Sequence, residues 1–278
     1  MEIITTKNIV FEGANKRMSL LDVYSPKNVG KHPVVIFLHG FKGFKDWGYF
    51  PMLLSKIAEN GFHVISFNMS HNGGTTENPI DFPDLDAFSN NTHSKEIFDT
   101  ESILTWLENQ KIFQYSSINI IGHSRGGGIA VLVTNRNIQV KKLITWASVD
   151  DFKSRLPNQK DLNNWRKEGV YFIKNGRTKQ EMPMKYGFVE DLLEQNEKLL
   201  ISNGAKGVNV PSLIIHGEKD KAVSFENAKN LNTWIKNSEL LRIPKTGHTF
   251  DGKHPFVGNN LPAASLKLLE ETLRFLKL

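Results

Sequence analysis

The chain has 278 residues, of which 39% are hydrophobic and 23% are charged, and its formal net charge is +6. This balance is typical of a globular protein with a sizeable core, and the length suits one large α/β domain. The sequence has no cysteine, which excludes disulfides, thiolate metal sites and a cysteine nucleophile.

The positive charges are scattered along the chain and form neither a basic block nor a nucleic-acid-binding module. No apolar run reaches the roughly 18 residues of a membrane span. The N-terminal residues also lack the basic-then-apolar pattern of a signal peptide. We therefore expect a cytoplasmic protein that has neither nucleic acid nor a membrane as a partner.

Strands and helices alternate in the first part of the chain. Residues 7–12 and 18–24 have the pattern of an antiparallel hairpin. The continuous apolar run Val34–Leu38 predicts a strand that is buried on both faces. Helical spacing over residues 50–59 and an apolar run at 62–67 predict a helix and the next strand. This alternation favours a mostly parallel sheet with helices on both faces.

A long polar segment interrupts this rhythm. Residues 70–94 are rich in Asn, Asp, Pro and Gly, which predicts a loop of the kind that borders a functional site. Helical spacing then returns over residues 96–110, and a further apolar run at 142–147 predicts a strand.

Residues 150–209 are predicted to form an inserted cap over the edge of the sheet. The segments 170–174 and 178–184 flank Asn175-Gly176, and Asn-Gly is a strong signal for a β-hairpin. Residues 188–201 have the pattern of one helix.

The alternation resumes after the insertion, with strands at 212–215 and 240–243 and a helix at 225–236. We predict a single α/β domain over residues 1–278, with the cap inside it. A final helix has an apolar stripe that we assign to core packing. The stripe consists of Leu266, Leu269, Leu273 and Leu276.

The segment Gly122–Gly126 has the pattern Gly-x-Ser-x-Gly and lies between two apolar runs. The first run is short and predicts a buried strand, whereas the longer second run predicts a buried helix. A serine at such a turn has strained backbone and an exposed hydroxyl, and the glycines let strand and helix approach closely. The pattern indicates Ser124 as a nucleophile. The simpler interpretation is a serine in an ordinary glycine-rich turn.

A serine hydroxyl attacks only when a base takes its proton and a third group orients that base. With this motif the expected chain order is nucleophile, acid, histidine. Asp220 follows the strand that ends at Ile215, which places its carboxylate at the carboxyl end of the sheet. We predict Asp220 as the acid, with Glu218 and Asp251 as alternatives.

The predicted base is His248, which follows the next strand. Gly247 permits the tight turn that brings an imidazole over the serine. His254 is the alternative base.

The reaction also needs two backbone N–H donors for the oxyanion of its transition state. We predict the N–H of Arg125, the residue after the nucleophile, as one donor. The second is the N–H of Phe41, which follows His39-Gly40 after the first buried strand. This chemistry needs no metal and no organic cofactor.

These motifs resemble those of the α/β-hydrolase superfamily over nearly the whole chain. They are His39-Gly40-Phe41, Gly122–Gly126, Gly217-x-x-Asp220 and Gly247-His248. The resemblance implies the α/β-hydrolase fold and a serine hydrolase whose triad is Ser124, Asp220 and His248.

Within the superfamily the chain resembles the dienelactone-hydrolase and cinnamoyl or feruloyl esterase-like branch. The grounds are the inserted hairpin and His-Gly-Phe in place of the His-Gly-Gly-Gly of many lipases. Two features depart from that branch. Related esterases often have Gly-His-Gly where this chain has residues 70–74, Ser-His-Asn-Gly-Gly, and dienelactone hydrolases proper use a cysteine nucleophile.

The leading hypothesis is hydrolysis of small carboxylic esters, aryl or hydroxycinnamoyl esters among them, through an acyl-enzyme on Ser124. Aromatic and basic residues of the inserted block suit an aryl or anionic acyl ester, although a solvated basic surface explains them at least as well. A small serine peptidase or amidase of the prolyl-oligopeptidase-like type would use the same triad. The third hypothesis is a non-catalytic binding protein on a hydrolase fold.

Overall fold

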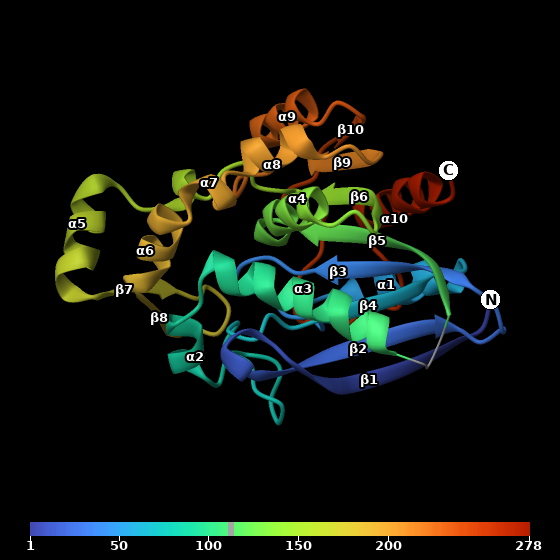
Figure 1. The fold of residues 1–278 in the computed structure, drawn as a ribbon, viewed down its shortest axis with the longest axis horizontal. Coiled ribbons are helices and arrows are strands. Elements are labelled where there is room, and N and C mark those ends of the chain that lie inside the picture. Colours follow the sequence, from blue (N-terminus) through green and yellow to red (C-terminus); the bar gives the residue numbers. More distant parts are fainter. Residues whose placement is uncertain (111–113) are drawn as a thin grey trace.

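A computed structural model describes residues 1–110 and 114–278 of the chain. Within these residues, eight strands form one sheet in the order β1-β2-β4-β3-β5-β6-β9-β10 (Figure 1). Strand β2 pairs antiparallel with β1 and β4, and the other neighbours are parallel. The fold is therefore the predicted mostly parallel α/β arrangement. The strands are β1 (Ile3–Glu12), β2 (Met18–Pro26), β3 (His32–Leu38), β4 (His63–Phe67), β5 (Tyr115–His123), β6 (Val140–Trp146), β9 (Ser212–Gly217) and β10 (Ser238–Ile243).

Helices cover both faces of the sheet. On one face α1 (Phe50–Glu59) and α10 (Ala263–Leu276) bury their apolar sides against the strands. On the other face lie α3 (His93–Asn109), α4 (Arg125–Arg136), α8 (Ile201–Gly207) and α9 (Phe225–Trp234).

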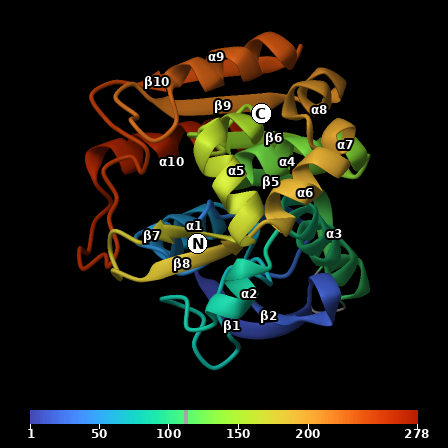
Figure 2. The same ribbon diagram turned by 90° about the vertical axis from the view of Figure 1, so that its left-hand side faces the viewer.

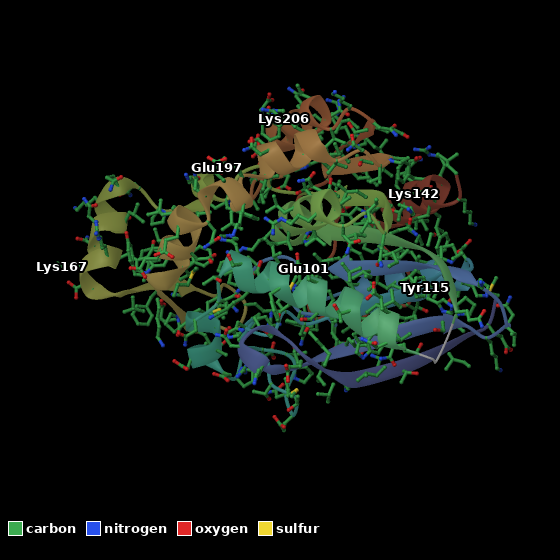
Figure 3. The ribbon with its side chains drawn as sticks, viewed as in Figure 1. Glu101, Tyr115, Lys142, Lys167, Glu197 and Lys206 are labelled. Atoms are coloured by element: carbon green, nitrogen blue, oxygen red, sulfur yellow. The ribbon has the colours of Figure 1, made fainter. Side chains whose placement is uncertain are left out.

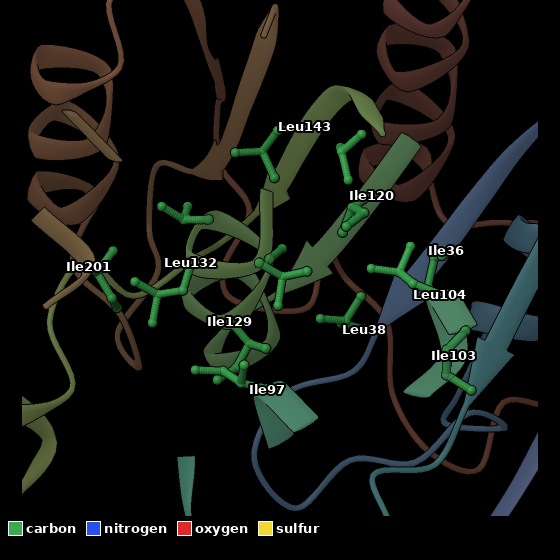
Figure 4. Close-up of a cluster of buried hydrophobic side chains, with 14 of the residues drawn as sticks. Ile36, Leu38, Ile97, Ile103, Leu104, Ile120, Ile129, Leu132, Leu143 and Ile201 are labelled. Atoms are coloured by element: carbon green, nitrogen blue, oxygen red, sulfur yellow. The ribbon is translucent and has the colours of Figure 1, made fainter. Parts of the chain in front are cut away.

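The two cores follow from the alternation of side chains along each strand. In β3, Ile36 and Leu38 join the core under α3 and α4, whereas Val35 and Phe37 join the core under α1 and α10. Figure 4 shows Ile36 and Leu38 beside Ile120 of β5 and the leucine and isoleucine side chains of the covering helices. Fully burying one such side chain stabilises the fold by about 1.5–3 kcal/mol. Because both faces of the central strands are buried, the sequences of these strands are continuous apolar runs.

The part of the segment between β6 and β9 that precedes α8 lies beyond the carboxyl ends of the parallel strands (Figures 1 and 2). It contains the predicted hairpin, in which β7 (Val170–Lys174) pairs antiparallel with β8 (Glu181–Lys185). The turn is longer than the predicted one, since β8 begins at Glu181 instead of Thr178. Within it the Asn175 side chain accepts hydrogen bonds from the N–H groups of Arg177 and Thr178. The other elements are η2 (Lys153–Arg155), α5 (Gln159–Glu168), α6 (Gly187–Glu194) and α7 (Asn196–Leu199). The cap boundaries at residues 150 and 209 stay a prediction.

The expectation of one helix over residues 188–201 is wrong. Gln195 ends α6, and Leu200 has extended backbone (φ −71°, ψ 102°) that separates α7 from α8. The turn at Leu200 lets Ile201 and Ala205 bury their side chains in the core on α4. Helical spacing in the sequence continues across these breaks, so it did not reveal them.

Two other expectations need correction. The predicted loop 70–94 contains a short helix, α2 (Leu85–Ser89), whose first turn is capped by the Asp84 carboxylate accepting from the Ala87 N–H. In α10, Leu266 is 44% exposed and lies outside the buried stripe, which Leu268 and Phe275 complete. Among the helices of residues 1–110 and 114–278, none is long and apolar enough to cross a membrane.

Candidate functional site

Ser124 occupies a sharp turn between β5 and α4. Its backbone has φ 57° and ψ −121°, a strained conformation for a residue other than glycine that costs about 1–3 kcal/mol. Glycines on either side allow the turn. A Cβ on Gly122 would lie 2.2 Å from the Gly126 carbonyl oxygen, and one on Gly126 would lie 2.5 Å from the His39 carbonyl oxygen. Helix α4 therefore packs backbone against backbone on β5 and on the end of β3, which presents the serine at the carboxyl end of the sheet.

A chain of hydrogen bonds joins Ser124, His248 and Asp220. The Ser124 Oγ lies 2.9 Å from His248 Nε2, and His248 Nδ1 lies 2.7 Å from Asp220 Oδ2. The three side chains follow β5, β10 and β9, so the parallel strands bring together residues that are up to 124 positions apart. This arrangement leaves His248 Nε2 as the atom that can take a proton from the hydroxyl.

The alternative acids and the alternative base have other partners. Glu218 Oε2 accepts from the Lys245 N–H at 3.1 Å, and Asp251 Oδ1 accepts from Thr246 Oγ1 at 2.6 Å. His254 Nδ1 accepts from the Gly48 N–H at 2.8 Å. None of the three has a hydrogen bond to Ser124 or His248 within the described part of the chain.

The Asp220 carboxylate is fully buried and its oxygens are held from several sides. Oδ1 accepts from the N–H groups of Ala222 and Val223, and Oδ2 faces His248 Nδ1 and, at 3.3 Å, His216 Nε2. Burial alone would raise the pKa of Asp220, but the hydrogen bonds from His216 and His248 hold that pKa below its ordinary value. The carboxylate therefore stays ionised, as an acid that orients a histidine requires.

Two further histidines support the site, and the sequence analysis did not single them out as such. His123 Nε2 donates to the His248 carbonyl oxygen at 3.0 Å. Burial, together with the charge of His248, lowers the pKa of His123 to about 3. His216, at the end of β9, donates from Nε2 to the Val223 carbonyl and faces Asp220. His123 lies within the Gly122–Gly126 motif and His216 directly precedes Gly217, but neither position says where the side chain points.

The loop after β3 packs directly against the serine. A Cβ on Gly40 would lie 2.8 Å from the Ser124 Cβ. His39 Nδ1 donates to the Gly40 carbonyl at 2.9 Å and its Nε2 accepts from the Met69 N–H at 3.1 Å, while burial lowers its pKa to about 4. Phe41 is the next residue of this loop, and Arg125 is the first residue of α4, where an N–H has no partner inside the helix.

Two cavities meet at the serine. The first has a volume of about 510 Å³ and the second about 430 Å³, and both are lined by Phe41, Lys42, Ser124 and His248. Aromatic and apolar side chains of the inserted segment wall the first cavity, and they include Phe152, Trp165, Tyr171, Met184 and Phe188. The second is lined by Trp47, Phe50, Arg177 and Lys253 among others. In the described residues, no three His, Asp or Glu side chains are grouped as metal ligands.

Known proteins share this architecture. A family model described as the alpha/beta hydrolase fold matches residues 33–173. The AB hydrolase superfamily protein YisY of Bacillus subtilis is 24% identical over 80% of this chain and 87% of its own length. The uncharacterized peptidase YtmA of the same organism is 26% identical over 76% of this chain and 72% of its own. The structure of Est1E from Butyrivibrio proteoclasticus with ferulic acid bound superposes with a TM-score of 0.69, at 19% identity over 97% of this chain and 100% of that one.

The close packing at the serine turn predicts a large effect of one methyl group. Gly122→Ala places a Cβ against the Gly126 carbonyl, so we expect the free energy of unfolding to fall by at least about 2 kcal/mol. Gly176→Ala is the matched control, because nothing lies within 4 Å of its Cβ position. Urea unfolding measures both. Equal stability of the two variants would contradict the packing described for Gly122.

The buried histidines predict a loss of stability in acid. His39 and His123 have folded pKa values of about 4 and about 3, against 6.5 for an unperturbed histidine. Between about pH 6.5 and pH 4 the unfolded chain binds protons that the folded protein does not, so each group lowers the free energy of unfolding by about 1.4 kcal/mol per pH unit as pH falls. Urea titrations at several pH values should show a shallower slope for His123→Asn than for the unsubstituted protein. An unchanged slope would show that His123 is not held neutral.

Proposed function

The chain belongs to the alpha/beta hydrolase fold family, and we propose that it is a serine esterase that cleaves carboxylic esters through an acyl-enzyme on Ser124. The observation that carries the proposal is the pair of hydrogen bonds from Ser124 Oγ to His248 Nε2 and from His248 Nδ1 to Asp220 Oδ2. These contacts have the geometry of a catalytic triad.

In the proposed reaction, His248 Nε2 takes the proton of the Ser124 hydroxyl as Oγ attacks the ester carbonyl carbon. The tetrahedral intermediate collapses when the imidazolium gives that proton to the departing alcohol oxygen. A water molecule, deprotonated by the same nitrogen, then attacks the acyl-enzyme and releases the carboxylic acid. The ionised Asp220 keeps the Nδ1–H of His248 pointing toward itself and stabilises the imidazolium.

The negative charge on the former carbonyl oxygen would be stabilised by the N–H groups of Phe41 and Arg125. Both residues line the first cavity beside Ser124, and the positive end of the α4 dipole points at the same place. Each such donor is worth about 2.7–4 kcal/mol in the transition state. The His39 ring supports this role, since its hydrogen bonds to Gly40 and Met69 fix the loop that presents Phe41.

The two cavities suit an ester, whose acyl and alcohol parts extend to either side of the reacting carbon. Aromatic walls in the first cavity favour a small aryl or hydroxycinnamoyl group. Est1E, which holds ferulic acid in its solved structure, has the same fold and supports this choice by analogy. The proposal requires no metal, cofactor, nucleic acid or membrane, and sets the reaction in the cytoplasm.

A serine peptidase or amidase is the second candidate, because the same three side chains also cleave amides and the related YtmA is described as a peptidase. A non-catalytic binding protein would have no need of the hydrogen-bonded chain at Ser124.

Substitutions in the proposed triad should remove activity without unfolding the protein. We expect Ser124→Ala and His248→Ala to lower kcat for a p-nitrophenyl ester by at least about 10⁴-fold, and Asp220→Asn to lower it by about 10³–10⁴-fold. Asp251→Asn is the matched control, since its carboxylate contacts Thr246 instead of His248. If Asp251→Asn were inactive and Asp220→Asn active, the acid assignment would be wrong.

Paired substrates should separate the esterase from the peptidase. An ester and an amide with the same acyl group, a hydroxycinnamate methyl ester and the matching methylamide, are compared by kcat/KM. We expect only the ester to be turned over at a measurable rate. Faster cleavage of a short peptide amide than of any ester in a panel would favour the peptidase.

A further inference from the structure

Three positively charged side chains line the first cavity, and no carboxylate of the described residues is part of its wall. The cations are Lys42, Arg125 and Arg155. Arg125 pairs with Glu96, which lies outside the cavity wall, at 3.2 Å. Within residues 1–110 and 114–278, neither Lys42 nor Arg155 has a carboxylate within 4 Å. Lys42 and Arg155 therefore have no ion-pair partner among the described residues, and the Lys42 ammonium donates to the Lys174 carbonyl at 3.4 Å.

Arg125 is held rigidly beside the nucleophile. Its guanidinium carbon lies 3.9 Å from the centre of the Phe41 ring and 5.2 Å from that of Phe188, and its side chain is only 12% exposed. Glu96 is fixed in turn by the Asn91 side-chain amide at 2.8 Å. A guanidinium has five N–H donors, and the contact with Glu96 uses Nη1. The plane of donors is thus fixed in place at the cavity wall.

The cations also act on one another. Burial lowers the pKa of Arg125, Glu96 opposes this, and the charge of Arg155 lowers it further. Burial lowers the pKa of Lys42, and the charge of Arg125 adds to that effect. Repulsion of this kind is a cost to the folded protein that a negatively charged ligand would relieve.

We propose that this cavity is a subsite for a carboxylate carried by the ester substrate, bound by Arg125 and Arg155 with Lys42 at the mouth of both cavities. The proposal rests on the esterase function and names its substrate class: esters with a free carboxylate on a small, flat body, such as monoesters of aromatic dicarboxylic acids. The planar guanidinium groups match a carboxylate in geometry as well as in charge, and the aromatic walls accept the flat body.

The basic residues on the outer side of the cap differ from these three. Figure 3 shows Lys167 on α5 at the outer end of the molecule, and its side chain is 82% exposed. Such a charge is solvated and screened by salt over about 8–10 Å. It therefore serves as a control for net charge.

The test compares substrates that differ in charge but hardly in size. Methyl 4-carboxycinnamate and methyl 4-carbamoylcinnamate place the difference on the acyl side, and 4-carboxybenzyl acetate and 4-carbamoylbenzyl acetate place it on the alcohol side. In one of the pairs we expect kcat/KM to be on the order of tenfold higher for the anionic ester at low salt. The ratio should fall as ionic strength rises.

Variants assign the preference to the cavity. Arg155→Gln and Arg125→Gln should each bring the ratio of anionic to neutral ester close to one, whereas Lys167→Gln should leave it unchanged. Arg155 is exposed, so its variant remains informative if Arg125→Gln fails to fold. A ratio at or below one in both pairs would overturn the proposal, and so would equal ratios in Arg155→Gln and Lys167→Gln.

A binding measurement separates failure of this subsite from failure of the esterase function. Calorimetry measures the affinity of 4-carboxycinnamate for the unsubstituted protein and for Arg155→Gln, with no need for turnover. We expect affinity on the order of tenfold weaker in the variant. No binding, or equal binding by both proteins, would overturn the subsite, even if neutral esters were hydrolysed through Ser124.

Discussion

The backbone contact between β5 and α4 is the constraint on which the rest of the site depends. Glycine at position 122 lets β5 meet α4 backbone to backbone, and glycine at position 126 lets α4 meet the end of β3, so the chain can turn sharply at Ser124. That turn forces Ser124 into strained backbone and exposes its hydroxyl where the carboxyl ends of the parallel strands meet. The sheet then brings His248 and Asp220 to the same place, because they follow the neighbouring strands on that edge.

Burial divides the histidines of the site into two kinds. His39 and His123 are buried, their pKa values lie well below 6.5, and each donates one hydrogen bond that fixes a backbone carbonyl near the site. His248 is partly exposed and faces both Ser124 and Asp220. Positive charge during the proposed reaction is therefore confined to the ring that has an ionised carboxylate beside it. Because His39 and His123 stay neutral, they keep their hydrogen bonds and do not compete with His248 for the proton of the Ser124 hydroxyl.

Long apolar runs made the sheet predictable from the sequence. The central strands are buried on both faces, so Val34–Leu38 and the other central strands are continuous apolar runs, which distinguishes them from the helices between them. The meeting of residues 124, 220 and 248 was predictable for a related reason, since chain order and the strand ends place them on one edge. The helix breaks at Gln195 and Leu200 were not predictable, because they depend on how α8 packs against α4. The pairing of Arg125 with Glu96 likewise joins residues 29 apart by a contact that no local pattern encodes.

The central claim is that Ser124, with His248 beside it, forms the acyl-enzyme while the backbone of Phe41 and Arg125 holds the oxyanion. A crystal structure of the protein after reaction with a fluorophosphonate tests this most directly, because the phosphonyl group reproduces a tetrahedral intermediate. The account predicts phosphorus bonded to Ser124 Oγ, with one phosphoryl oxygen within about 3 Å of both backbone nitrogens. A phosphonyl group on another residue, or on Ser124 with that oxygen turned away from both nitrogens, would contradict it.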